Sequence, residues 1–133
     1  MSINLTAQDK TTVQTAAYGA IDLLAAASIG SGPGKIAADG YLALFSTTGP
    51  IGHVLAEKRR AAKPEGKSVA AYAEQVLPAL TGAVRLLKAQ DPTQAAEFRA
   101  ILRTAIDAAT AGRVTAPLES MIGKINAALD AGE

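Results

Sequence analysis

The sequence predicts an all-α single domain, a bundle of five or six helices in which two helical hairpins form a pseudo-repeat. Apolar residues recur at intervals of three and four, the period of an amphipathic helix, and long β-branched runs are absent. Hydrophobic residues make up 49% of the chain and aromatic residues only 4%, so alanine and aliphatic side chains must fill the core. The chain of 133 residues is long enough to bury such a core, so residues 1–133 are predicted to form one domain.

The first predicted helix begins at Thr6, with Asp9 three residues further on. From Ala20 to Ile29 the helix is apolar nearly all round, which indicates a central helix touched from several sides. Its inner stripe is predicted to comprise Val13, Ala17, Ala20, Ile21, Leu24 and Ser28.

Two shorter helices are expected next, after the glycine-rich break at 30–34. One runs from about Lys35 to Ser46, and another runs from Ile51 to about Ala62 after Thr48-Gly49-Pro50. The inward residues of the first are predicted to be Ala37, Tyr41, Leu44 and Phe45.

The fourth predicted helix spans Val69 to Ala89, with Ser68 as its N-cap. Pro78 lies inside it. Because proline removes a backbone hydrogen bond and clashes with the preceding turn, we expect a kink or a break near Leu77. The apolar stripe comprises Val69, Tyr72, Ala73, Val76, Leu80, Val84 and Leu87.

The clearest pattern is a terminal hairpin from Asp91 to Leu129. Asp91 is a good N-cap, Pro92 suits the first helical position, and Gln94 sits where a capping-box partner would reach back. Gly112 is the predicted stop. The apolar stripes of the two helices are Phe98, Ile101, Leu102, Ala105, Ile106 and Ala109, then Leu118, Met121, Ile122, Ile125 and Leu129.

A short loop joins these two helices, with Thr115 as the N-cap of the second and Pro117 in its first turn. Such a loop predicts that the two helices pack on each other. The order of long helix, glycine turn and amphipathic helix also occurs earlier, and Ala20-Ile21-Asp22 matches Ala105-Ile106-Asp107.

In these hairpins the chain resembles the TerB-like helical family, named for a tellurite-resistance protein. The segment Ala108-Ala109-Thr110-Ala111-Gly112-Arg113-Val114-Thr115 follows the turn of that family, and Gln94 to Leu129 matches best. The copy from Ala16 to Phe45 fits more loosely. The resemblance implies a pseudo-repeat of two hairpins and a stress-related setting.

Family members often carry acidic residues at these turns, which suggests metal binding. Here Ala111 occupies the aspartate position, and Glu119 lies one residue after the expected glutamate. In the first copy no carboxylate follows Gly30 until Asp39. The resemblance therefore favours the fold and weakens the metal site.

Charge and composition limit the partners. The formal charge is +1, so the overall field is weak and argues against general nucleic-acid binding. The absence of cysteine excludes disulfides and favours an intracellular, cytoplasmic location. The most apolar run, Ala16 to Ile29, is too short to span a bilayer and contains Asp22. No signal peptide is expected from residues 1–5.

Asp22 and Asp107 are the most interesting polar residues. Asp22 lies in the apolar end of the first helix, with Tyr18 four residues before it. If these two candidate ligand-binding carboxylates shared a buried pocket, the pKa of at least one would be raised, as acid–base or metal chemistry needs. The alternative is that both reach solvent or hydrogen-bond a neighbouring helix end.

Two basic stretches are candidates for an anion or an acidic partner. Gly30 to Lys35 is superficially similar to a phosphate loop, but the spacing is one residue short and Ile36 follows the lysine. A plain loop, or anion binding with Lys35 at a helix start, are the two interpretations. Lys58, Arg59 and Arg60 form either a solvated helix end or a partner-binding cluster.

His53 is the only histidine, with Glu57 four residues on and expected on the same face. One imidazole and no cysteine exclude a structural zinc site, so no metal ligand or cofactor is predicted.

The leading interpretation is a non-enzymatic cytoplasmic helical module that binds a protein or a small ligand. Self-association of an alanine-rich helix is a further expectation. Two alternatives stay open. One is a divalent-metal or small-ligand binder that uses Asp22, Asp39, Asp107 or Glu119, and the other is a small enzyme with a buried carboxylate.

Overall fold

The computed structural model describes residues 5–28, 33–57, 68–112 and 114–133. These residues form helices without a strand, which confirms the all-α bundle. The helices are α1 (Ala7–Ala27), α2 (Pro33–Phe45), α3 (Gly49–Ala56), α4 (Val69–Gln90), α5 (Pro92–Thr110) and α6 (Ala116–Ala131).

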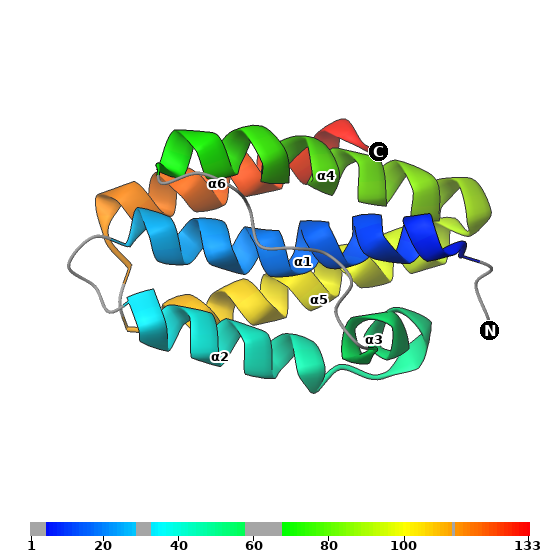
Figure 1. The fold of residues 1–133 in the computed structure, drawn as a ribbon, viewed down its shortest axis with the longest axis horizontal. Coiled ribbons are helices and arrows are strands. Elements are labelled where there is room, and N and C mark those ends of the chain that lie inside the picture. The colour runs from blue at the N-terminus through cyan, green and yellow to red at the C-terminus, as the bar shows by residue number, and fades with distance from the viewer. Residues whose placement is uncertain (1–4, 29–32, 58–67, 113) are drawn as a thin grey trace.

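Helix α1 lies in the middle of the bundle and contacts all five other helices (Figure 1). Helices α4 and α6 lie on one side of it, and α2 lies on the other. The short α3 sits at the end of the bundle where α1 begins. This confirms the central position that the apolar second half of α1 predicted.

The long helices run in two opposite directions, with α1 and α5 one way and α2, α4 and α6 the other (Figure 1). The start of α5 consequently meets the end of α6. There Arg99 pairs with Asp130, and its Nη1 lies 3.0 Å from Oε1 of Glu133. Hydrogen bonds to Glu133 and Asp130 raise the pKa of Arg99 above its usual value.

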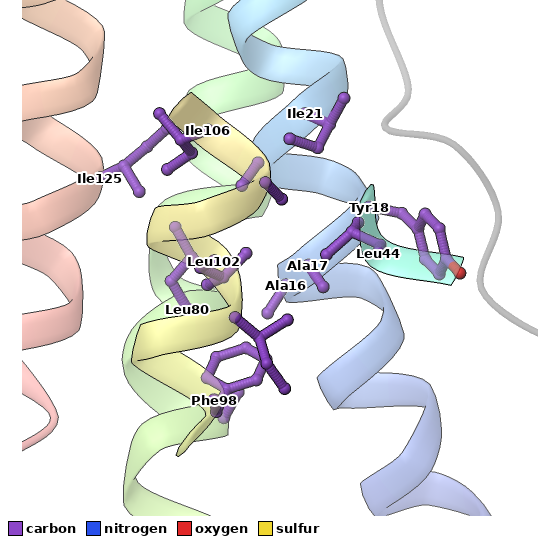
Figure 2. Close-up of a cluster of buried hydrophobic side chains, with 14 of the residues drawn as sticks. Ala16, Ala17, Tyr18, Ile21, Leu44, Leu80, Phe98, Leu102, Ile106 and Ile125 are labelled. Carbon is purple, nitrogen blue, oxygen red and sulfur yellow. The ribbon is translucent and has the colours of Figure 1, made fainter. Parts of the chain in front are cut away.

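The terminal hairpin is packed differently from our expectation. The backbone of α5 approaches α2 and α4 most closely, and that of α6 approaches α4 and α1. Helices α5 and α6 meet through side chains, such as the Arg99 ion pairs and Ile106 and Ile125, which point toward one another in Figure 2. A short loop sets the direction of the returning helix, but the closest backbone neighbours of the two helices are α1, α2 and α4.

Local signals place the helix ends well. At the start of α1, Thr6 Oγ1 accepts from the Asp9 amide at 3.0 Å, and Asp9 Oδ2 accepts from the Thr6 amide at 3.2 Å. Ser68 caps α4 through the Ala71 amide at 3.0 Å. Gly112 ends the α5 turn with a φ of 72°, a conformation that favours glycine.

Two other predicted end signals were confirmed only in part. The Asp91 side chain caps α5 through the Thr93 amide, but the Asp91 amide already donates to the Leu87 carbonyl at 2.8 Å. Gln94 therefore has no free amide to reach back to. Its side chain is buried, and its Oε1 has no partner within the described part of the chain. Thr115 stands at the N-cap of α6 without a side-chain capping bond.

Pro78 does not break α4, which continues from Val69 to Gln90. Pro78 and Glu74 are both exposed, so water can solvate the Glu74 carbonyl that loses its helical partner. The third helix ends at Ala56, earlier than predicted, and residues 58–62 lie outside the described residues.

The core consists mainly of aliphatic side chains and alanine (Figure 2). The predicted stripes of α1 and α5 are buried throughout. On α2 the predicted stripe was partly wrong. Leu44 is buried as predicted, but Ile36 and Gly40 are also buried, and Phe45 is 54% exposed. Gly40 lets this face of α2 lie close to α1, since a Cβ at Gly40 would lie 2.7 Å from the Ile21 side chain.

Candidate functional site

Four polar residues spaced four apart form a row along α1, and we call them the polar row: Lys10, Gln14, Tyr18 and Asp22. Residues at this spacing share one face of a helix. Each has a partner on α2 or at the C-terminal end of α3. The polar row therefore faces the α2–α3 side of the bundle.

The middle of the polar row holds the end of α3. The last carbonyls of a helix have no partner within it. Gln14 Nε2 donates to the Val54 carbonyl at 3.2 Å, and the Tyr18 hydroxyl donates to the Leu55 carbonyl. Both polar side chains are buried. Helix α1 thus adds donors to the last carbonyls of α3, of which that of Val54 also accepts from the Glu57 amide at 3.3 Å.

Lys10 continues this arrangement toward solvent. Its Nζ lies 3.1 Å from Oε1 of Glu57, the residue that caps α3, and both side chains are 29% exposed. Glu57 has left the helical conformation, with a ψ of 159°. The expectation that Glu57 shares a helical face with His53 was therefore wrong, and His53 is exposed.

At the other end of the polar row, the Tyr41 hydroxyl of α2 donates to Asp22 Oδ1. Asp22 is buried, so this hydrogen bond helps to compensate for the loss of water around its carboxylate. The Tyr18 ring lies edge-on to Tyr41, with centroids 5.5 Å apart. It also meets Phe45 of α2 at 5.6 Å.

Tyr18 is the point where these contacts meet. Figure 2 shows its ring leaving α1 on the side opposite Leu80 and Leu102. Its hydroxyl bonds α3 and its ring contacts α2. One side chain therefore links the two helices that cover the polar row.

The outer face of α2 carries an apolar surface. Leu42 is 66% exposed and Phe45 is 54% exposed, and we call this pair the α2 patch. The remaining exposed large hydrophobic side chain in the described chain is Val114, which precedes α6. The α2 patch and the polar row share Phe45 and its ring contact with Tyr18.

The predicted site residues are only partly brought together. Tyr18 and Asp22 are buried and both meet Tyr41, but Asp107 is exposed on α5. The two carboxylates therefore do not share burial. Lys35 is exposed in the first turn of α2, and Lys58, Arg59 and Arg60 lie outside the described residues.

Metal-binding geometry is not found in the described part of the chain, where no three His, Cys, Asp or Glu residues are grouped to hold an ion. Asp39 is half-buried on α2, and Glu119 is exposed on α6.

No protein-family model, curated protein or solved structure matches this chain. In the ranges that the structure describes, no helix has the length and apolar character needed to cross a bilayer.

Sequence reasoning missed Lys10, Gln14 and Tyr41 as partners in this arrangement. The signal for the first two was the four-residue spacing through Tyr18 to Asp22. Helix α1 thus carries a polar stripe as well as its apolar stripe. The part played by Tyr41 depends on how α2 packs on α1, which no local pattern shows.

Proposed function

We propose that this chain is a non-enzymatic helical binding module whose contact surface is the α2 patch. The observation that carries the proposal is the exposure of Leu42 and Phe45, three residues apart on one helix. Exposed apolar side chains that lie together mark surfaces for contact with other proteins, because burial removes them from water.

The support beneath the patch favours binding. Phe45 rests on the ring of Tyr18, which is itself 1% exposed and held by the Leu55 carbonyl. An aromatic side chain that is already positioned loses less conformational entropy when a partner covers it. The α2 patch thus combines a flexible aliphatic residue with a supported ring.

The proposed partner is a protein with a complementary apolar surface, and a second copy of this chain is one such partner. The resemblance of the hairpins to the TerB-like family supports a stress-related setting. A chain without cysteine suits the reducing cytoplasm, which we propose as its location.

Site-specific photocrosslinking tests the proposal. A benzophenone amino acid is placed at Leu42, and in a matched variant at Val114, which is 56% exposed and far from α2 in sequence. In the cells that make the protein, we expect a discrete crosslinked species from the Leu42 position alone. Its mass distinguishes a second copy from another protein.

Equal labelling from both positions, or none from Leu42, would contradict the proposal. Circular dichroism and thermal melting of each variant confirm that the bundle is intact. The same crosslinking experiment is then repeated with the probe at Ala38, one turn before Leu42 on α2. Leu42→Lys should reduce the crosslinked fraction obtained from this probe.

A further inference from the structure

Helix α3 is the shortest helix described, with eight residues. Thr48 and Gly49 stand at its start, and Gly49 has a φ of 85°, which an L side chain rarely adopts. The helix buries Ile51 and Leu55 completely and contacts α1, α2 and α5. It is thus a small unit attached to a larger bundle.

The attachment of α3 to α1 is partly polar. Gln14 and Tyr18 bond the Val54 and Leu55 carbonyls, and Lys10 pairs with Glu57. When α3 separates from α1, water can replace each of these hydrogen bonds, so the free-energy cost of breaking these polar contacts is modest.

The contact between α1 and α4 is different. It is apolar and close, since a Cβ at Gly19 would lie 2.9 Å from Val76. Val76, Leu80, Ala83 and Val84 are fully buried on α4. Separation there exposes aliphatic surface with no compensation from water. The two interfaces of α1 therefore resist opening to different extents.

We propose that α3 opens as a separate unit while the rest of the bundle stays folded, and that Tyr18 couples this opening to the α2 patch. The coupling to binding rests on the function proposed above, whereas the opening of α3 does not. Proteins commonly open in such local units, which have lower free energies than global unfolding.

The coupling follows from the two ends of the Tyr18 side chain. Its hydroxyl is anchored on α3, and its ring supports Phe45 on α2. With α3 released, the hydroxyl loses its anchor and the ring is free to move away from Phe45. The position of Phe45 within the α2 patch then changes, although Phe45 does not take part in the hydrogen bond between Tyr18 and α3.

Thiol labelling measures the opening directly, because the chain has no native cysteine. Val54→Cys places a thiol on α3 at a position that is 4% exposed, and Val84→Cys places one in the α4 core. We expect the thiol at position 54 to react with a thiol reagent at least roughly tenfold faster than the thiol at position 84, with weaker dependence on denaturant. Equal rates with equal denaturant dependence would overturn the separate opening.

The coupling is tested in the same backgrounds. Tyr18→Phe keeps the ring and removes the hydrogen bond to α3, so it should speed labelling at position 54 roughly two- to tenfold relative to position 84. Tyr72→Phe removes a tyrosine hydroxyl on α4 instead, and serves as the control that leaves this ratio unchanged.

A second matched pair approaches the coupling from α2. Phe45→Ala removes the ring that Tyr18 contacts and should also speed labelling at position 54 relative to position 84. Leu42→Ala alters an exposed aliphatic neighbour and should not. If Phe45→Ala and Leu42→Ala act alike, Tyr18 does not couple the two helices. Because labelling needs no partner, this result is independent of the photocrosslinking outcome.

Discussion

At the scale of single residues, Asp22 has the least usual environment, because few carboxylates are buried in an aliphatic bundle. The hydrogen bond from Tyr41 is one of its means of compensation. The bond also joins α2 directly to α1. Asp22 is therefore best understood as a structural residue that specifies the packing of the first hairpin.

Tyr41→Phe tests this structural role. The substitution keeps the ring and removes a donor to a buried carboxylate, so we expect the free energy of unfolding to fall by about 1–3 kcal/mol. Urea denaturation measures the change. Tyr72→Phe on α4 is the control, because Tyr72 is only half-buried, and its cost should stay below about 0.5 kcal/mol. A loss no larger for Tyr41 than for Tyr72 would refute the structural role of the bond.

At the scale of helices, the starts of α1, α4 and α5 follow from capping residues that can be identified in the sequence. Thr6, Ser68 and Asp91 each supply an oxygen to an amide of the next turn. These interactions span two or three residues, so they need no knowledge of the fold. The polar row has a visible four-residue period, but its partners on α2 and α3 are distant in sequence.

At Gly52 of α3, helix propensity and packing have opposite effects on a substitution by alanine. Alanine is favoured over glycine inside a helix by about 1 kcal/mol. A Cβ at Gly52, however, would lie 2.6 Å from the Thr47 carbonyl group, which is backbone and cannot move aside. We therefore expect Gly52→Ala to destabilise α3 and to speed labelling of a thiol at position 54.

The control is Gly123→Ala on α6, where a Cβ would meet nothing within 4 Å. There propensity acts alone, so stability should rise by about 0.5–1 kcal/mol. Urea denaturation of both variants compares them on one scale. An increase in stability for Gly52→Ala as well would mean that the turn before α3 adapts readily.

At the scale of the whole molecule, the bundle is organised around α1, and its polar groups are used mainly to join helices. Arg99 joins α5 to α6, and Thr81 Oγ1 of α4 donates to the Ala128 carbonyl of α6 at 2.7 Å. Among the described residues, no three His, Cys, Asp or Glu side chains are grouped to hold an ion. We propose a binding role in preference to a metal-dependent one.

A thermal-shift scan with divalent metals tests that preference. We expect the melting temperature to stay constant in millimolar calcium, magnesium or manganese. A ligand at about a hundred times its dissociation constant would stabilise the folded state by about 2.7 kcal/mol, which is several degrees in a domain of this size. A reproducible rise that Asp22→Asn or Asp39→Asn abolishes would instead support a metal site.

The sequence by itself determined the fold class, the apolar stripes of α1 and α5, and most helix starts, because these depend on periodicity and on contacts within one turn. Only the tertiary structure decided that Phe45 is exposed, that Asp107 is not buried with Asp22, and that α5 packs on α2 and α4. Those outcomes depend on which distant surfaces meet. Many pairings of amphipathic helices bury similar apolar areas, so the choice among them lies in the detailed shape of close contacts such as Gly19 with Val76 and Gly40 with Ile21.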